Sequence, residues 1–231
     1  MQHFTPHPYQ QAAIDAIIDK PSVGLWMEMG LGKTVVTLTA IDTLIYDAAE
    51  IQRVLVVAPK KVAEATWQDE AQKWDHLQHL RISTVLGTEA QRIAALNTPA
   101  DVYIINRENC YWLVGHYGRH WPFDMVVLDE ASSFKNHAAQ RFKALKAVRP
   151  KIAKVVELTG TPAPNNLLDL WAQIYLLDQG ERLGKYVTHY RQAYFWPTEY
   201  SWEAKDGAGD AIRRKISDLV LSFKAADLLE L

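Results

Sequence analysis

Short apolar runs rich in β-branched residues alternate along this chain with longer stretches of helical periodicity. The runs are residues 23–26, 54–57, 82–85, 102–105, 125–128 and 155–158. Most of them are apolar nearly throughout, as expected for strands that are buried on both faces of a parallel sheet. The alternation therefore predicts an α/β fold, in which a mostly parallel sheet carries helices on both faces.

Helical patterns fill most of the intervening sequence. We expect helices at residues 9–19, 33–48, 66–74 and 167–177, where apolar side chains gather on one face. The tail differs, and we expect an irregular loop at residues 194–209 and a last helix at 211–223. Trp196, Tyr200 and Trp202 in that loop could stack on bases, but we favour packing beneath the loop.

The composition excludes several protein classes. With 231 residues, 48% of them hydrophobic, the chain can bury a sizeable core. The 25 Lys and Arg residues against 27 Asp and Glu residues exclude a strongly basic nucleic-acid coat protein, although a local basic strip remains compatible. Cys110 is the single cysteine, so no disulfide framework exists and we expect a buried thiol.

The sequence carries no targeting signal. Its first residues lack the basic start and apolar stretch of a signal peptide. No apolar run approaches the roughly 20 residues that a membrane-spanning helix needs. We therefore expect a soluble, cytoplasmic protein without a membrane partner.

A glycine-rich turn joins the first apolar run to a helical pattern. Its sequence is Met29-Gly30-Leu31-Gly32-Lys33-Thr34. It matches the phosphate-loop pattern only in part, because Met27 stands where the first glycine is expected. The strand-loop-helix context is the one that phosphate binding requires, since backbone N–H groups at a helix start can point at phosphate oxygens. Lys33 would reach the β- and γ-phosphates and Thr34 would ligate Mg²⁺.

Two adjacent acids follow the run at 125–128. A phosphate-loop site needs a carboxylate near Mg²⁺ from a strand end, and Asp129 fits that role. Glu130 can polarise the attacking water as a general base. The alternative is an ordinary polar strand end, which is improbable once the phosphate loop is considered with it. Lys33, Asp129 and Glu130 are thus the predicted catalytic residues.

These segments resemble motifs I, II and III of superfamily-two helicases, and in detail the Swi/Snf-type DNA translocases of phages and bacteria. The matching segments are residues 29–34, Asp129-Glu130-Ala131-Ser132 and Leu158-Thr159-Gly160-Thr161-Pro162, with 134–136 and 165–171 following the family wording. The resemblance spreads from Tyr9 to Asp227. It implies a RecA-like ATP-binding lobe at residues 1–193, ATP and Mg²⁺ as cofactors, and DNA, in all expectation double-stranded, as a partner.

The resemblance also implies roles for residues outside the phosphate loop. Gln10 resembles the glutamine that reads adenine, although a surface helix-start residue is an equal alternative. Pro59, Lys60 and Lys61 resemble a loop that faces the nucleic-acid backbone, as Arg107 does further along; a solvated charged pair is a serious alternative for the lysines. Ser132, Thr159, Gly160 and Thr161 would couple hydrolysis to movement, the alternative for motif III being a simple turn.

Three positions depart from the family pattern. Trp26 and Met27 replace a small and an acidic residue, so the sequence does not define which residues form the walls of the nucleotide pocket. Ser132 replaces a histidine that normally bridges motifs, so the strength of coupling is open as well.

The family's motors have two RecA-like lobes, and the second lobe supplies arginine fingers. We find no match to the second lobe's motifs, and residues 222–227 resemble the segment before the crossing. Residues 194–231 are accordingly expected to lead to a hinge toward a second lobe in cis or in trans. Two other functions compete with the translocase. A small-molecule phosphate-loop kinase lacks its arginine lid here, whereas a non-catalytic ATP- or DNA-binding module stays open.

Overall fold

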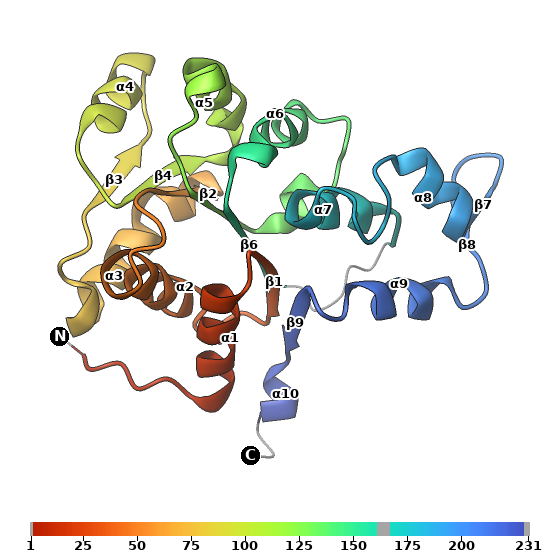
Figure 1. Cartoon of the computed structure of the whole chain (residues 1–231), viewed down its shortest axis with the longest axis horizontal. Coiled ribbons are helices and arrows are strands. Elements are labelled where there is room, and N and C mark those ends of the chain that lie inside the picture. The colour runs from red at the N-terminus through yellow and green to blue at the C-terminus, as the bar shows by residue number, and fades with distance from the viewer. Residues whose placement is uncertain (1, 161–166, 229–231) are drawn as a thin grey trace.

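The computed structural model describes residues 2–160 and 167–228 of the chain. The central feature is a seven-stranded sheet with the order β3-β4-β2-β5-β6-β1-β9, in which every pair of neighbouring strands is parallel (Figure 1). The strands are β1 (Ser22–Met27), β2 (Val54–Ala58), β3 (Ile82–Val85), β4 (Val102–Asn106), β5 (Met125–Asp129), β6 (Lys154–Thr159) and β9 (Val220–Phe223). The predicted parallel α/β sheet is confirmed.

The helices cover both faces of this sheet. They are α1 (Pro8–Asp19), α2 (Lys33–Asp42), α3 (Trp67–Lys73), α4 (Glu89–Asn97), α5 (Cys110–Tyr117), α6 (Gln140–Val148), α7 (Leu167–Asp178), α8 (Val187–Tyr194), α9 (Ala208–Ile216) and α10 (Ala225–Leu228). In the expected helix 33–48, α2 ends at Asp42 and a π-helical turn, Thr43–Asp47, continues it. The expected helices at 9–19, 66–74 and 167–177 lie within one residue of their predicted bounds.

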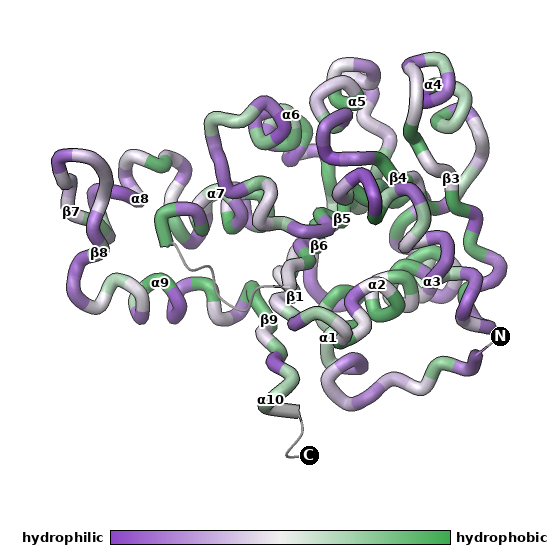
Figure 2. The backbone as a smooth tube through the Cα atoms, turned by 180° about the vertical axis from the view of Figure 1, so that it is seen from behind, coloured by the Kyte–Doolittle hydropathy of each residue, from purple (hydrophilic) through white to green (hydrophobic). Residues whose placement is uncertain are grey.

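The central strands are mostly apolar because a hydrophobic core covers each face of the sheet. Along β2, Val54 and Val56 belong to the core with α1, α2 and α3, whereas Leu55 and Val57 belong to the core with α5, α6 and α7. Figure 2 shows the resulting concentration of hydrophobic residues in the strands and polar residues along the outer segments.

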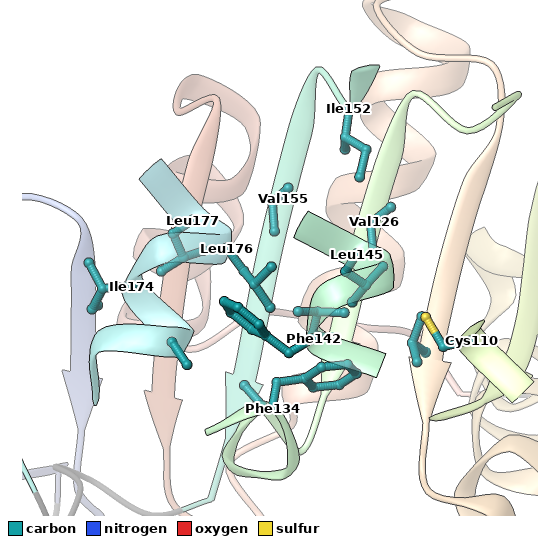
Figure 3. Packing of buried hydrophobic residues seen from close by; sticks show 14 of the residues in the cluster. Cys110, Val126, Phe134, Phe142, Leu145, Ile152, Val155, Ile174, Leu176 and Leu177 are labelled. Carbon is teal, nitrogen blue, oxygen red and sulfur yellow. The ribbon is translucent and has the colours of Figure 1, made fainter. Parts of the chain in front are cut away.

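The second of these cores contains several aromatic side chains. Figure 3 shows Phe134 and Phe142 between β5, β6 and α7, with Leu176 beside them. Cys110 lies at the edge of the same core and is fully buried, which confirms the expected buried thiol. Burial raises the pKa of its thiol to about 12.

The tail corrects two predictions. The expected loop at 194–209 contains an antiparallel hairpin, β7 (Phe195–Pro197) paired with β8 (Trp202–Ala204). A polar turn closes it, in which the Thr198 amide donates to the Ser201 carbonyl at 2.9 Å. Aromatic residues favour such extended pairs. The predicted packing beneath a loop is wrong for Trp196 and Tyr200, whose exposed fractions are 61% and 90%.

The predicted helix at 211–223 is also wrong in its bounds. The helix α9 begins at Ala208 after Gly207, whose φ of +73° is in the left-handed region, and it ends at Ile216. Residues 220–223 form β9, which pairs with β1 in the register Gly24↔Val220. A long-range pairing that no local pattern reveals thus decides their conformation, and it places these residues in the sheet of the lobe.

No helix in the described segments is long and apolar enough to cross a bilayer.

Candidate nucleotide site

The predicted site residues follow neighbouring strands at one edge of the sheet. β6 lies between β1 and β5, so the loops after these three strands meet where parallel strands end, which is the usual ligand-binding edge of such sheets. The loop after β1 turns into α2 through Gly30 (φ +86°) and Gly32 (φ +84°). Glycine adopts this conformation without steric cost, and the first amide groups of α2 have no acceptor within the helix. The structure thus forms the predicted strand-loop-helix arrangement.

Lys33 is half-buried at the start of α2. Its ammonium donates hydrogen bonds to the carbonyl oxygens of Met27 at 2.9 Å and Glu28 at 3.3 Å. Burial lowers the pKa of Lys33, while the nearby carboxylates of Glu130 and Asp129 raise it in part. The structure therefore brings together the three predicted catalytic side chains, and among the described residues the hydrogen bonds of the ammonium go to two backbone carbonyls.

A pocket of about 560 Å³ opens beside the loop. The phosphate loop and the start of α2, α1, the N-terminal arm and the end of α3 all contribute to its walls. Its lining residues are His3, Phe4, Thr5, His7, Gln10, Gly30, Gly32, Lys33, Thr34, Val35, Glu70, Lys73 and Trp74. Such a size suits a nucleotide-sized ligand.

The N-terminal arm is fixed against α3 at this pocket. The Gln2 amide donates to the Lys73 carbonyl at 3.0 Å, and the Asp75 amide donates to the Gln2 carbonyl at 3.1 Å. Phe4 packs edge-on against Trp74 with ring centroids 5.2 Å apart. These aromatic walls were absent from the sequence prediction, because nothing local relates the arm to residues seventy positions later.

Gln10 is buried in the pocket wall rather than at a free helix start. Its amide Nε2 donates to the Leu31 carbonyl at 3.2 Å, and its Oε1 accepts from the His7 amide at 2.9 Å. The surface alternative is therefore wrong, because only 7% of Gln10 is exposed. The side chain connects α1 to the phosphate loop, and both ends of its amide already have protein partners.

Asp129 ends β5 and is buried. The indole Nε1 of Trp67, at the first residue of α3, donates to its Oδ2 at 3.0 Å. Burial raises the pKa of Asp129, and the Trp67 hydrogen bond and the Lys33 charge act against that rise. Trp67 was missed by sequence reasoning, since an apolar position in an amphipathic helix gives no sign of such a bond.

Glu130 adopts the left-handed conformation with φ +57°. This conformation costs a non-glycine residue on the order of 1 kcal/mol, and such strain gathers at functional sites. The half-buried carboxylate acts on the charge of Lys33. The bend directs the chain away from the strand directly after the two acids.

The start of motif III lies against the phosphate loop. A Cβ placed on Gly160 would lie 3.3 Å from Cγ of Met29 and 3.8 Å from Nζ of Lys33. Thr159 is buried at the end of β6, and Ser132 is half-buried after β5. Thr161 lies outside the described residues, as do positions 162–166. For the described part, the predicted neighbourhood of motif III and the phosphate loop is present.

The residues predicted to contact nucleic acid lie directly after the strands β2 and β4. Pro59 follows β2 and is half-buried, Lys60 pairs loosely with Glu64 at 3.9 Å, and Lys61 is exposed. Arg107 follows β4 and donates from Nε to Glu108 at 3.0 Å. β2 and β4 are neighbours, so the four residues share one stretch of the sheet edge.

The family departures at Trp26 and Met27 do not reshape the pocket. Trp26 packs in the core beneath α7, and Met27 is fully buried in the core beneath α1 and α2. Only the Met27 carbonyl takes part in the site, as an acceptor for Lys33. The walls left open by the sequence are built instead by the arm and α3.

Glu28 is a further residue that sequence reasoning missed. Its carboxylate accepts from the Ala225 amide at 2.8 Å, and its own amide donates to the Phe223 carbonyl at 3.2 Å. The phosphate loop is thereby bonded to the end of β9 and the start of α10.

Comparisons with known proteins agree with this architecture. The SNF2-related domain family matches residues 19–220. Protein p41 of Acyrthosiphon pisum secondary endosymbiont phage 1 is 39% identical over 243 residues, covering 100% of this chain and 53% of that protein. Helicase SWR1 of Mycosarcoma maydis is 33% identical over 180 residues, covering 74% of this chain and 10% of that protein.

The fold of the chain is also similar to that of solved structures. The Sulfolobus solfataricus SWI2/SNF2 ATPase core in complex with dsDNA superposes with a TM-score of 0.75 at 23% identity, covering 96% of this chain and 47% of that one. At this identity the match establishes the RecA-like fold alone. The chain spans about half the length of the phage protein and of the solved core. On the sequence match over residues 19–220, the chain belongs to the SNF2-related domain family.

Proposed function

We propose that this chain is the ATP-binding lobe of an ATP-dependent DNA translocase of the Swi/Snf type, which couples ATP hydrolysis to movement on DNA. The observation that carries the proposal is the meeting of Lys33, Asp129 and Glu130 beside a glycine loop that opens α2. A cation, a buried carboxylate and a second acid around free helix-start amides form the set that phosphoryl transfer requires.

The residues fit Mg²⁺-ATP chemically. The amides of residues 30–34 and the Lys33 ammonium would hold the phosphates. Thr34 and Asp129 would hold Mg²⁺, which neutralises developing charge when bound. Asp129 is suited to a cation because its carboxylate is buried at the end of β5 and its hydrogen-bond donor is a neutral indole rather than a cation. Lys33 would exchange the two carbonyls that it contacts for phosphate oxygens.

Glu130 is proposed to take the proton of the attacking water. Glu130 follows Asp129 in sequence, and its charge acts on Lys33. It would therefore lie near the terminal phosphate, where a water could stand between the two. General-base catalysis of this kind contributes about 10²- to 10⁴-fold. Ser132, Thr159, Gly160 and Thr161 are proposed to couple this chemistry to the DNA-facing surface, since Gly160 abuts the phosphate loop.

Gln10 is proposed to favour adenine, although its side-chain amide is not free to pair with the base. Its amide is bonded to the Leu31 carbonyl and the His7 amide, so a base would have to replace one of these bonds. Gln10 also fixes Leu31 in the phosphate loop, which alone would make it important for nucleotide binding.

DNA, double-stranded, is the proposed partner. Pro59, Lys60, Lys61 and Arg107 would contact its backbone from the ends of β2 and β4. Contacts to phosphates supply affinity without reading sequence. A SWI2/SNF2 core of the same fold has been solved with dsDNA, which supports the choice of duplex.

A second RecA-like lobe, in cis or in trans, is proposed to complete the site. Arginine fingers are worth about 10³- to 10⁵-fold in phosphoryl transfer. We therefore expect the 231-residue chain to bind Mg-ATP weakly and to hydrolyse it very slowly. The coverage of about half of the phage protein and of the solved core supports this division.

The test is an ATPase assay of the 231-residue chain with duplex DNA, single-stranded DNA, RNA or no nucleic acid. The proposal predicts Mg-dependent ATP binding, slow turnover, and at most a small stimulation that is largest with duplex DNA. Fast, DNA-stimulated turnover by this chain alone would contradict the need for a second lobe. Binding of DNA without any binding of Mg-ATP would favour a non-catalytic module instead.

A further inference from the structure

A second pocket lies away from the phosphate loop, although Lys135, Asn136 and Asp169 in its wall belong to segments that follow the family wording. It measures about 640 Å³ and lies between the segment after β5, the start of α7 and the β7–β8 hairpin. We name it the hairpin pocket, and the residues that matter here are Lys135, Asn136, Arg191, Thr198, Ser201 and Trp202. Figure 1 shows the hairpin and α8 projecting together beyond α7, at the end of the sheet away from α4.

Arg191 supplies one of the cations of this pocket. Within the described residues its buried Nε has no hydrogen-bond partner, and its guanidinium takes part in no ion pair there. The guanidinium carbon lies 5.9 Å from the ring centre of Trp202, which orients the side chain. A buried donor without an acceptor is costly, so an anion bound here would satisfy it.

The charges around Arg191 are mostly positive. Lys135 lines the pocket and is only partly neutralised, by Asp169 at 3.4 Å. The pKa of His137, which also lines the pocket, is lowered first by burial and then by the positive charges of Arg191, Lys143 and Lys146. The pocket wall thus holds two cations, Lys135 and Arg191, against one carboxylate, Asp169, and the charges of Lys143 and Lys146 act on His137 in the same wall.

Neutral donors complete the pocket. The Asn136 Oδ1 accepts from the Ala138 amide at 2.9 Å, so its amino group remains as a donor. The hydroxyl-bearing residues Thr198 and Ser201 lie on the hairpin turn. A phosphodiester needs such a set, with one or two cations and a few neutral donors. The acids Glu199 and Glu203 are exposed on the hairpin, which restricts the site to the floor near Arg191 and Lys135.

The position along the sheet suggests which phosphate-bearing ligand fits. Arg107 follows β4, Lys60 and Lys61 follow β2, and Lys135 comes shortly after β5. β4, β2 and β5 are consecutive in the sheet, and neighbouring strands lie about 4.8 Å apart. The hairpin pocket is therefore the next cationic feature after the proposed DNA contacts, on the same edge of the sheet.

We propose that the hairpin pocket is an additional binding site for a backbone phosphate of DNA, held by Arg191 and Lys135. This inference rests on the proposed DNA partner but not on the phosphate-loop chemistry. It extends the DNA-binding surface from the ends of β4 and β2 to a hairpin that carries no family motif. Trp202 orients Arg191 in the pocket, and Asp169 limits the affinity by pairing with Lys135.

The test is a titration of fluorescent duplex DNA with the 231-residue chain at several salt concentrations, read by anisotropy. Arg191→Gln and Lys135→Gln are each expected to weaken binding about three- to tenfold and to reduce the salt slope by about one. Asp169→Asn is expected to tighten binding, because it frees Lys135. Arg213→Gln on α9 is the matched control, since Arg213 is exposed and pairs with Asp210 at 2.9 Å, and it is expected to change little.

A second measurement locates the DNA directly. Ser201→Cys on the hairpin can carry a photo-crosslinker, because the only other thiol, Cys110, is fully buried. Ser217 lies before the start of β9, at the edge of the sheet opposite to the proposed DNA contacts. Strong crosslinking to duplex DNA from Ser201→Cys, with little from Ser217→Cys, would support the site. Equal affinities for the wild type, Arg191→Gln and Lys135→Gln, with weakening by Lys61→Gln, would overturn this inference and leave the proposed function intact. Absence of any DNA binding by the wild type would overturn both.

Discussion

The indole Nε1 of Trp67 donates a hydrogen bond of 3.0 Å to Oδ2 of Asp129, across 62 positions of sequence. Trp67 is fully buried and begins α3, and Asp129 ends β5. The bond connects the segment after Lys60 and Lys61 to the carboxylate proposed to hold Mg²⁺. A movement of α3 on DNA would therefore act directly on the nucleotide site.

Replacing Trp67 by phenylalanine is expected to weaken Mg-ATP binding. The change keeps an aromatic ring but leaves the buried Oδ2 without its donor, so the pKa of Asp129 rises further and the carboxylate holds a cation less well. The free energy of unfolding is expected to fall by about 1–3 kcal/mol, the cost of one unsatisfied buried group. Calorimetric titration with Mg-ATP and urea unfolding measure the two effects.

Trp171→Phe is the matched control. Its indole also donates to a carbonyl, that of the half-buried Gly184 at 2.9 Å, in the core on the other face of the sheet. It is expected to lower stability without changing the affinity for Mg-ATP. Equal affinities of Trp67→Phe and the wild type would refute the link between Trp67 and the cation.

Two glycine substitutions separate backbone strain from a steric clash in the phosphate loop. Gly30→Ala and Gly32→Ala both place alanine at a positive φ, which costs about 1–2 kcal/mol. A Cβ at Gly32 would also lie 2.6 Å from Nε2 of Gln10, whereas one at Gly30 meets no described atom within 4 Å. We expect Gly32→Ala to lose more nucleotide affinity and more stability than Gly30→Ala, in the same titrations. Equal losses would mean that Gln10 does not support the loop.

Glu157 is predicted to make stability depend on pH. Its carboxyl is fully buried in β6, and burial raises its pKa well above the usual range, with the Arg149 charge opposing the rise. The folded chain then keeps a proton that the unfolded chain loses above about pH 4.3, so the free energy of unfolding falls by about 1.4 kcal/mol per pH unit until the folded pKa is reached. The stabilising effect is complete below the unfolded pKa and is lost as the pH rises.

Glu157→Gln removes that titration. The variant is expected to match the wild type near pH 4 and to gain on it steadily at higher pH, in urea unfolding at a series of pH values. Glu203→Gln, at an exposed hairpin residue, serves as the control. A pH-independent difference between Glu157→Gln and the wild type would show that the pKa of Glu157 is the same in the folded and the unfolded chain, and would contradict this prediction.

Cys110 provides a measure of global opening. Its buried thiol has a pKa raised to about 12, and only the exposed thiolate reacts readily. Labelling by a thiol reagent at pH 8 is expected to be very slow in the folded chain and fast in urea. Fast labelling without denaturant would contradict the burial of Cys110 at the start of α5.

The sequence predicts the sheet well because its strands are apolar on both faces and separated by amphipathic helices. The phosphate loop and the acids at 129–130 are local patterns with a chemical reason, and the structure brings them together. The pocket walls could not be foreseen in the same way. Trp67, Phe4 and Trp74 look like ordinary apolar positions, and only the tertiary fold gives them their neighbours.

The tail also adopts structure that the sequence alone could not predict. Residues 220–223 become a strand because β1 leaves an edge that they can pair with, and not because of a local signal. The hairpin at 195–204 combines aromatic residues with proline and polar turn residues, a mixture that is compatible with either a loop or a strand. Composition alone could not choose between them.

The most direct test of the central claim is a calorimetric titration of the 231-residue chain and its Lys33→Ala variant with Mg-ATP. Loss of the Lys33 ammonium removes charge-assisted bonds worth about 1.5–3 kcal/mol, so the affinity is expected to fall about ten- to a hundredfold. Circular dichroism and the unfolding midpoint are expected to stay close to those of the wild type. Lys215→Ala on α9, an exposed residue remote from the loop, is expected to bind as the wild type does. Unchanged affinity in Lys33→Ala would contradict the assignment of the phosphate loop as the nucleotide site.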